Sequence, residues 1–183
     1  MKRFLTAALA LICIFALFAC SESESEAPDG QKTAGRAAGN EAVNYSFFYP
    51  EKWEVAENTG VVMLKYNCSS ASGIYEYATM SVLTFNLADS SQGARDYWNG
   101  YEKDIQKAYS GNEKIDDKEI KLGGTVALKI KYFLSKDDGR FEFEQVVCCR
   151  NGSVYIVTLG APEKYYEAVN ADFGIMLDSF VFE

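Results

Sequence analysis

Apolar and β-branched residues gather in short stretches separated by polar turns after residue 44, and this pattern predicts β-strands. The predicted strands cover 45–49, 61–66, 78–85, 125–133, 141–149 and 153–159. In the third of these, Met80 and Val82 alternate with their neighbours, as in a strand with one buried face. Pro50 ends the first strand, and Trp53 follows it as a partly buried side chain.

Two residue pairs typical of tight hairpins connect the last three strands. They are Asp138-Gly139 and Asn151-Gly152, so these strands are expected to form an antiparallel meander. The segment 117–122 is short and charged and is followed by a glycine pair, and no strand is predicted there.

Helical spacing of apolar residues occurs in two places. The first stripe consists of Ala94, Tyr97, Trp98, Tyr101, Ile105 and Ala108. Residues 89–91 offer N-caps before it, and 110–112 end it. We expect these aromatic residues to pack on the sheet, and the alternative is that they floor a ligand cleft. The second helix is expected to begin at Pro162, with Tyr165 or Tyr166, Val169, Phe173, Met176 and Phe180 on its apolar stripe.

This order of elements predicts an α+β domain over 44–183, with an antiparallel β-sheet flanked by helices. Three segments resemble the PsbP family: 47–50 followed by Trp53, 152–155 and 177–180. That family shares its fold with a Ran-binding nuclear import factor and with DcrB-like bacterial lipoproteins. The resemblance spans about 45–182. It implies an α/β/α sandwich with a non-enzymatic accessory or binding role, and no ion- or partner-binding motif of the photosystem proteins is matched.

The N-terminus predicts export and lipid anchoring. Lys2 and Arg3 precede an uncharged run that ends at Ala19 and is shorter than the roughly 20 residues of a spanning helix. The segment Leu17-Phe18-Ala19-Cys20 resembles a lipobox, which implies a signal peptide over 1–19 and a diacylglycerol thioether on Cys20. The alternative is an uncleaved anchor or an ordinary signal peptide with a chance cysteine.

Residues 20–43 are expected to form the lipidated cysteine and a disordered linker, acidic at first and then rich in Ala and Gly. The acidic run is interpreted as a solvated spacer, with a recognition tail as the alternative. Two of the 18 basic residues precede Cys20 and all 26 acidic residues follow it, so the exported chain carries a net charge of −10. This charge argues against binding of nucleic acid, and against anionic lipid binding through the domain surface.

Histidine is absent, which excludes Ser-His-Asp and Cys-His catalysis and histidine-ligated zinc. We expect no catalytic, cofactor-binding or metal-binding residues. Asp137 and Asp138 could hold calcium, but no EF-hand loop surrounds them and turn chemistry explains them better.

Three cysteines follow Cys20: Cys68, Cys148 and Cys149. Export permits a disulfide from Cys68 to either of the other two, and the alternative is that all three are small apolar core residues. Because adjacent strand residues point to opposite faces, at most one of Cys148 and Cys149 is expected to face the core.

The leading functional hypothesis is a membrane-anchored envelope lipoprotein that acts as a binding or accessory module. Its expected partners are the membrane, through the lipid on Cys20, and an envelope protein. The alternative is a lipoprotein that binds a small ligand or a divalent cation between the helices and the sheet.

Overall fold

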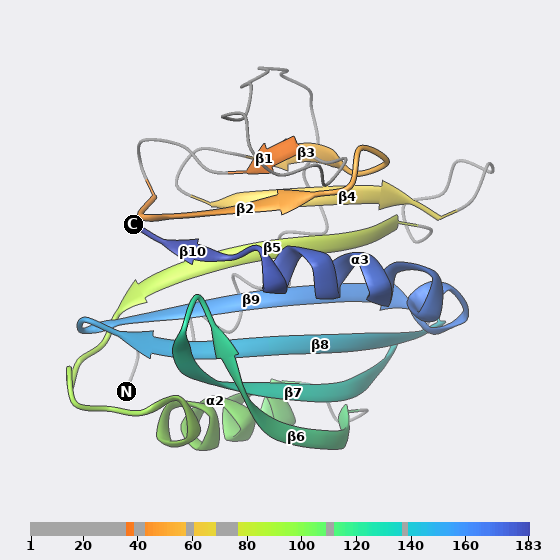
Figure 1. The fold of residues 1–183 in the computed structure, drawn as a ribbon. Helices are drawn as coiled ribbons and strands as arrows, with labels where there is room; N and C mark the ends of the chain where they lie inside the picture. Colours follow the sequence, from red (N-terminus) through yellow and green to blue (C-terminus); the bar gives the residue numbers. More distant parts are fainter. Residues whose placement is uncertain (1–35, 39–42, 58–60, 69–76, 109–111, 137–138) are drawn as a thin grey trace.

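The computed structural model describes residues 36–38, 43–57, 61–68, 77–108, 112–136 and 139–183 (Figure 1). Its largest element is a seven-stranded antiparallel sheet in the order β3-β4-β5-β9-β8-β7-β6. The strands are β3 (Glu54–Glu57), β4 (Val62–Asn67), β5 (Tyr77–Asn86), β6 (Asn112–Leu122), β7 (Thr125–Lys136), β8 (Gly139–Arg150) and β9 (Ser153–Pro162).

Each face of this sheet is covered by one helix. On one face lie α3 (Tyr166–Asp178) and a small sheet of β1 (Arg36–Ala38), β2 (Tyr45–Tyr49) and β10 (Val181–Phe182). On the other face, α2 (Ala94–Ala108) packs on β7 and β8 (Figure 1). The predicted α+β fold, an antiparallel sheet flanked by helices, is confirmed.

Two hydrophobic cores result, one on each face of the sheet. The core under α3 contains Tyr166, Val169, Phe173 and Met176, as the predicted stripe of the last helix requires. The core under α2 contains Trp98, Tyr101 and Ile105, which are 2%, 9% and 5% exposed. The aromatic stripe of this helix therefore packs on the sheet, as expected.

Details at both helix starts differ from the prediction. Pro162 is the last residue of β9, with the extended ψ of 135°, and a 3-10 turn η3 (Glu163–Tyr165) separates it from α3. The fixed φ of proline suits both states, so the residue alone could not decide between them. Asp89 accepts hydrogen bonds from the backbone N–H and the hydroxyl of Ser91. These bonds form a turn before Ala94, where α2 begins, and do not cap the helix.

Residues 117–122, to which the sequence pattern assigned no element, belong to the eleven-residue edge strand β6. Among the described strands it pairs with β7 alone, and its charged residues and bulge are typical of a protected sheet edge. Trp53 is also more deeply placed than expected, since it is 0% exposed.

Strand β1 lies inside the range assigned to the linker. Arg36–Ala38 pairs with β2, and the small side chain of Ala38 is 4% exposed against the first core. The folded layer therefore includes these three residues in addition to the predicted domain.

Two hairpin turns have left-handed backbone at both central positions. Asn151 and Gly152 have φ of 51° and 76°, and Gly123 and Gly124 have φ of 52° and 80°. Such pairs match the twist of antiparallel hairpins, so the first turn is confirmed and the second shows that the glycine pair connects two strands. Asp138 of the other predicted turn lies outside the described residues.

Candidate functional site

The predicted lipid anchor lies outside the described residues, as do Cys20, the signal segment 1–19 and most of the linker. Lipidation of Cys20 therefore stays a prediction. Within the described ranges, every helix is too short or too polar to cross a membrane.

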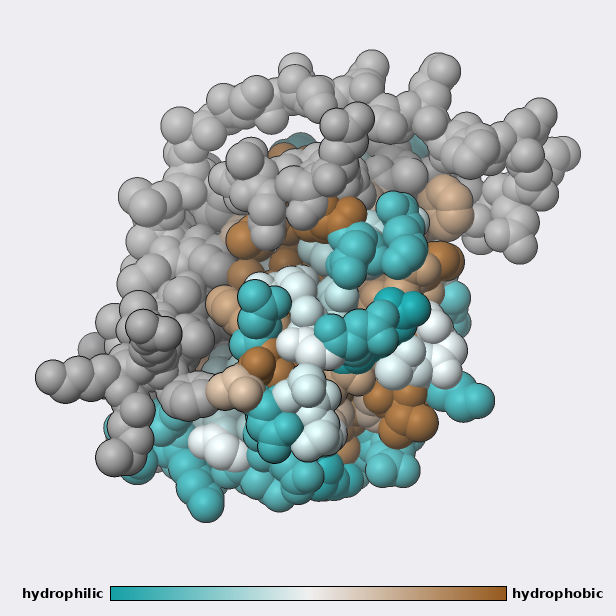
Figure 2. All heavy atoms as spheres, turned by 90° about the vertical axis from the view of Figure 1, so that its left-hand side faces the viewer, coloured by the Kyte–Doolittle hydropathy of each residue, from teal (hydrophilic) through white to brown (hydrophobic). Residues whose placement is uncertain are grey.

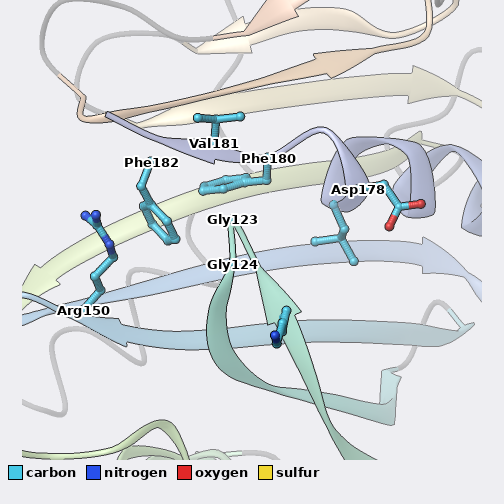
Figure 3. A pocket seen from close by; sticks show the side chains of 9 residues that line it. Gly123, Gly124, Arg150, Asp178, Phe180, Val181 and Phe182 are labelled. Carbon is cyan, nitrogen blue, oxygen red and sulfur yellow. The ribbon is translucent and has the colours of Figure 1, made fainter.

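A hollow of about 350 Å³ opens where three distant parts of the chain meet (Figure 3). These parts are the turn between β6 and β7, the end of β8, and the segment that leaves α3 and forms β10. The lining residues are Lys121, Gly123, Gly124, Arg150, Leu177, Asp178, Phe180, Val181 and Phe182. Part of the segment that carried the PsbP resemblance, 177–180, thus lines this hollow.

The aromatic floor of the hollow is fixed by ring contacts. Phe180 stacks on Tyr45 at 5.2 Å between ring centroids, and Phe182 meets Tyr155 edge-on at 4.8 Å. The two phenylalanine rings are 5.1 Å apart at 69°. Gly123 lies so close that a Cβ there would be 2.7 Å from Phe182 Cδ2, so only glycine lets this turn reach the ring.

Opposite charges flank this floor. The Arg150 guanidinium lies 4.8 Å from the centroid of the Phe182 ring, and Figure 3 shows Asp178 on the other side of the two phenylalanines. Neither Arg150 nor Lys121 forms an ion pair with a carboxylate of the described residues. The hollow therefore has two cations in its lining that lack a carboxylate partner in the described ranges, beside an apolar floor.

Buried carboxylates elsewhere in the described ranges are each paired with a lysine. Lys129 Nζ lies 2.6 Å from Glu144, and Lys131 pairs with Glu142. The hydroxyl of Tyr166 donates to Glu144 at 3.0 Å, and burial, reinforced by this carboxylate, raises the pKa of that tyrosine. These contacts neutralise the buried charges, so neither Glu142 nor Glu144 is an unpaired acid.

Asp172 is held in the same way. Its carboxylate accepts a hydrogen bond from Trp53 Nε1 at 2.8 Å and lies 2.8 Å from Lys52 Nζ. These contacts join α3 to the segment before β3, so Asp172 has a structural task.

Cys148 and Cys149 are free thiols on opposite faces of β8. The expectation that at most one of them faces the core is wrong, because both faces of the sheet are covered. Burial raises the pKa of Cys148 to about 12 and that of Cys149 to about 11, so neither is a thiolate nucleophile at neutral pH.

The strand register separates Cys68 from this pair. Asn67 pairs with Tyr77, and the ladder continues from Thr79 through Gly160 to Phe143. Cys68 therefore lies near the start of β8, roughly 24 Å along the strand from Cys148. A disulfide needs Cα atoms within about 7 Å, which excludes this alternative.

No group of three potential metal ligands occurs among the described residues. Asp137 and Asp138, considered for calcium, lie outside them. Hydrogen bonds from Ser91 lower the pKa of Asp89, which is occupied in its own turn.

Figure 2 shows the end of the molecule that carries the C-terminus, where hydrophobic residues occur in small groups among hydrophilic ones. The large hydrophobic side chains exposed in the described ranges are Val55, Val126, Ile175 and Val181. Val181 is 55% exposed and lines the hollow, so an apolar contact is available at its rim.

Sequence reasoning did not identify the hollow. It noted 123–124 as a chain break and 177–180 as a family-like segment, but nothing near Arg150 marks that residue in the sequence. Only the register of β8 and the path of the C-terminal segment bring these parts together.

Comparison with known proteins identifies the fold. No protein-family model and no curated protein sequence matches the chain. Among solved structures, cyanobacterial PsbP (CyanoP) from Synechocystis sp. PCC 6803 is 18% identical with a TM-score of 0.58, over 86% of this chain and 98% of that chain. LpqN, involved in cell envelope biogenesis of Mycobacterium tuberculosis, is 14% identical with a TM-score of 0.55, over 82% and 86%.

A protein of unknown function from Pseudomonas aeruginosa is 15% identical with a TM-score of 0.54, over 78% of this chain and 92% of that chain. At such identities, structural likeness establishes the fold and not the activity. The chain therefore has the PsbP-like α+β fold that its sequence predicts.

Proposed function

We propose that this chain is a lipid-anchored lipoprotein of the cell envelope whose domain is a non-enzymatic binding module. The lipid on Cys20 holds the domain at the extracytoplasmic side of the membrane, and the linker lets it reach a partner there. The N-terminal segment supports the anchor, and LpqN, a protein of the same fold, is involved in cell envelope biogenesis.

The observation that carries the binding role is the distribution of charge. Each of the three buried carboxylates in the described ranges is paired with a lysine, while Arg150 and Lys121 line one hollow without a carboxylate partner among the described residues. Catalysis requires an acid, a base or a nucleophile with a matched pKa, whereas a binding site can use charged groups that have no internal ion pair. The hollow provides such charged groups in Arg150 and Lys121.

The alternative of a divalent-cation site stays a prediction without support from the hollow. Lys121 and Arg150 would repel a metal ion there, and Asp178 is the one carboxylate in the lining.

Two measurements test the proposal. Cys20→Ala is expected to stop lipid-dependent processing and to move the protein from the membrane to the soluble envelope fraction. Crosslinking in intact envelopes is expected to recover a protein partner with the wild-type chain. Unchanged processing and partition would contradict the anchor, and wild-type envelopes that yield no crosslinked partner would contradict the binding role.

A further inference from the structure

We propose that the hollow binds an acidic peptide segment, with one carboxylate on Arg150 and an adjacent apolar side chain on Phe182. This inference rests on the binding role proposed above and names the kind of partner that the hollow selects.

Charge favours an acidic ligand at this place. The chain has a net charge of −8, and most described lysine and arginine side chains are engaged by carboxylates. Arg150 and Lys121 are not engaged in the described ranges, and both line the hollow. A carboxylate there finds two such cations in the lining of one hollow, which favours an acidic ligand.

Arg150 is held in a geometry suited to a carboxylate. Its guanidinium carbon lies 4.8 Å from the centroid of the Phe182 ring, and that ring contacts Tyr155 and Phe180. This cation–π contact positions the guanidinium without using a carboxylate, and a guanidinium can bind a carboxylate through two parallel N–H donors. Because the side chain is already ordered, binding loses little conformational entropy.

The other lining residues determine which side chains are favoured next to the carboxylate of the ligand. Phe182 is partly exposed beside Arg150, so an apolar side chain next to the carboxylate can cover its ring. Val181 is 55% exposed and extends the apolar rim on the other side of β10 (Figure 3). Asp178 lies beyond the aromatic floor and is exposed, so it repels a second carboxylate and accepts a hydrogen bond from a peptide N–H (Figure 3). The lining therefore favours one acidic residue beside apolar ones over a long acidic run.

The test uses the isotope-labelled full chain and a capped hexapeptide, acetyl-Gly-Ser-Glu-Val-Phe-Ser-amide. Analogues with Gln or Lys in place of Glu are compared by NMR titration, which follows the Gly123 and Gly124 amides and Arg150 Nε–H. We expect the Glu peptide to shift these resonances, and the Gln analogue to bind about tenfold more weakly, because a charge-assisted hydrogen bond is lost.

The variant Arg150→Gln is expected to weaken the Glu peptide by about tenfold as well. Lys103→Gln is the matched control, since Lys103 is an exposed residue of α2 without an ion pair in the described ranges. Its affinity is expected to stay within about twofold of the wild type, as for a distant surface charge.

Three outcomes would overturn the proposal: no shift at the hollow with the Glu peptide, equal binding of the Gln analogue, or equal weakening by the two variants. Vesicles containing an anionic lipid form a further arm, and shifts at the hollow with vesicles but not with peptide would assign it to a membrane surface instead. If an envelope partner crosslinks equally to wild type and Arg150→Gln, the binding role stands and the hollow is the wrong site.

Discussion

Asp172 shows how much of the fold depends on one buried carboxylate. It is 7% exposed, lies on α3, and is the acceptor for the indole N–H of Trp53, which is 0% exposed. Lys52 neutralises its charge. The contacts of Asp172 with Trp53 and Lys52 therefore connect α3 to the segment between β2 and β3.

Replacement of Asp172 by Ala is expected to lower the free energy of unfolding by about 2–3 kcal/mol, because the buried indole N–H of Trp53 loses its acceptor. Urea unfolding followed by tryptophan fluorescence measures the change. Asp178→Ala is the control on the same helix, where an exposed carboxylate is expected to matter by less than about 0.5 kcal/mol. Equal effects would show that the contact to Trp53 contributes nothing.

The two thiols of β8 are expected to resist alkylation in the folded protein. With the pKa of Cys148 raised to about 12 and that of Cys149 to about 11, the thiolate is scarce at pH 8. Peptide mapping after iodoacetamide treatment should find both cysteines unmodified in buffer and modified in urea. Rapid labelling of Cys148 in buffer would contradict its burial.

The burial of single residues could not be predicted fully, because it depends on which elements cover each face of the sheet. Alternation correctly placed Cys148 and Cys149 on opposite faces of a strand, but it could not show that both faces are covered. The sequence also gives no register between β4 and β8, so the disulfide from Cys68 stayed open until the ladder was known.

At the level of elements, α2 is fastened to the edge strand β6 by a charge network. Asp117 pairs with Arg95 of α2 and with Lys114, and Lys114 also lies 3.9 Å from Glu102 of α2. Hydrogen bonds from Lys114 and Arg95 hold the pKa of Asp117 below its usual range. Folding is therefore linked to proton binding at this carboxylate.

The sign of this link gives a pH-dependent prediction for Asp117→Asn. A lowered folded-state pKa stabilises the protein fully above about pH 4, and the contribution disappears as the pH falls through the folded-state pKa. Near neutral pH the variant should lose under about 1 kcal/mol, because solvent screens this partly exposed cluster. Urea titrations at several pH values should show the difference vanish in acid, and a difference that grows there would contradict the assignment.

Alanine substitutions in the turn between β6 and β7 distinguish backbone strain from a steric collision. Gly124→Ala meets no atom within 4 Å and is expected to cost about 1 kcal/mol from its left-handed φ of 80°. Gly123→Ala adds a collision with Phe182 and should cost more, with a change in the shape of the hollow. Urea unfolding of both variants measures the order, and a Gly123→Ala protein as stable as Gly124→Ala would contradict the close packing.

The elements that could be predicted are those whose pattern reflects burial. The helices and the central strands have apolar stripes because they face a core, and the Asn151-Gly152 turn follows from backbone sterics. Strand β6 could not be predicted in this way, since an edge strand in solvent keeps charged residues. Strands β1, β3 and β10 have two to four residues, too few for a period to emerge.

At the level of the whole molecule, an acidic domain presents one hollow where unpaired cations meet an aromatic floor. Residues from β6, β8 and the C-terminal segment form it, and no local pattern in the sequence joins them. The N-terminal segment, by contrast, is interpretable from sequence because its signal is local. Together they support the proposal of a tethered module that binds through this end of the sheet.

Site-specific photocrosslinking in intact cells tests this claim most directly. A photoreactive residue replaces Val181 at the rim of the hollow in one strain and Lys103 on α2 in another. We predict a discrete adduct with an envelope protein from position 181 that is absent from position 103 and is lost when Arg150→Gln is added. The same adducts from both positions, or none from position 181, would contradict it.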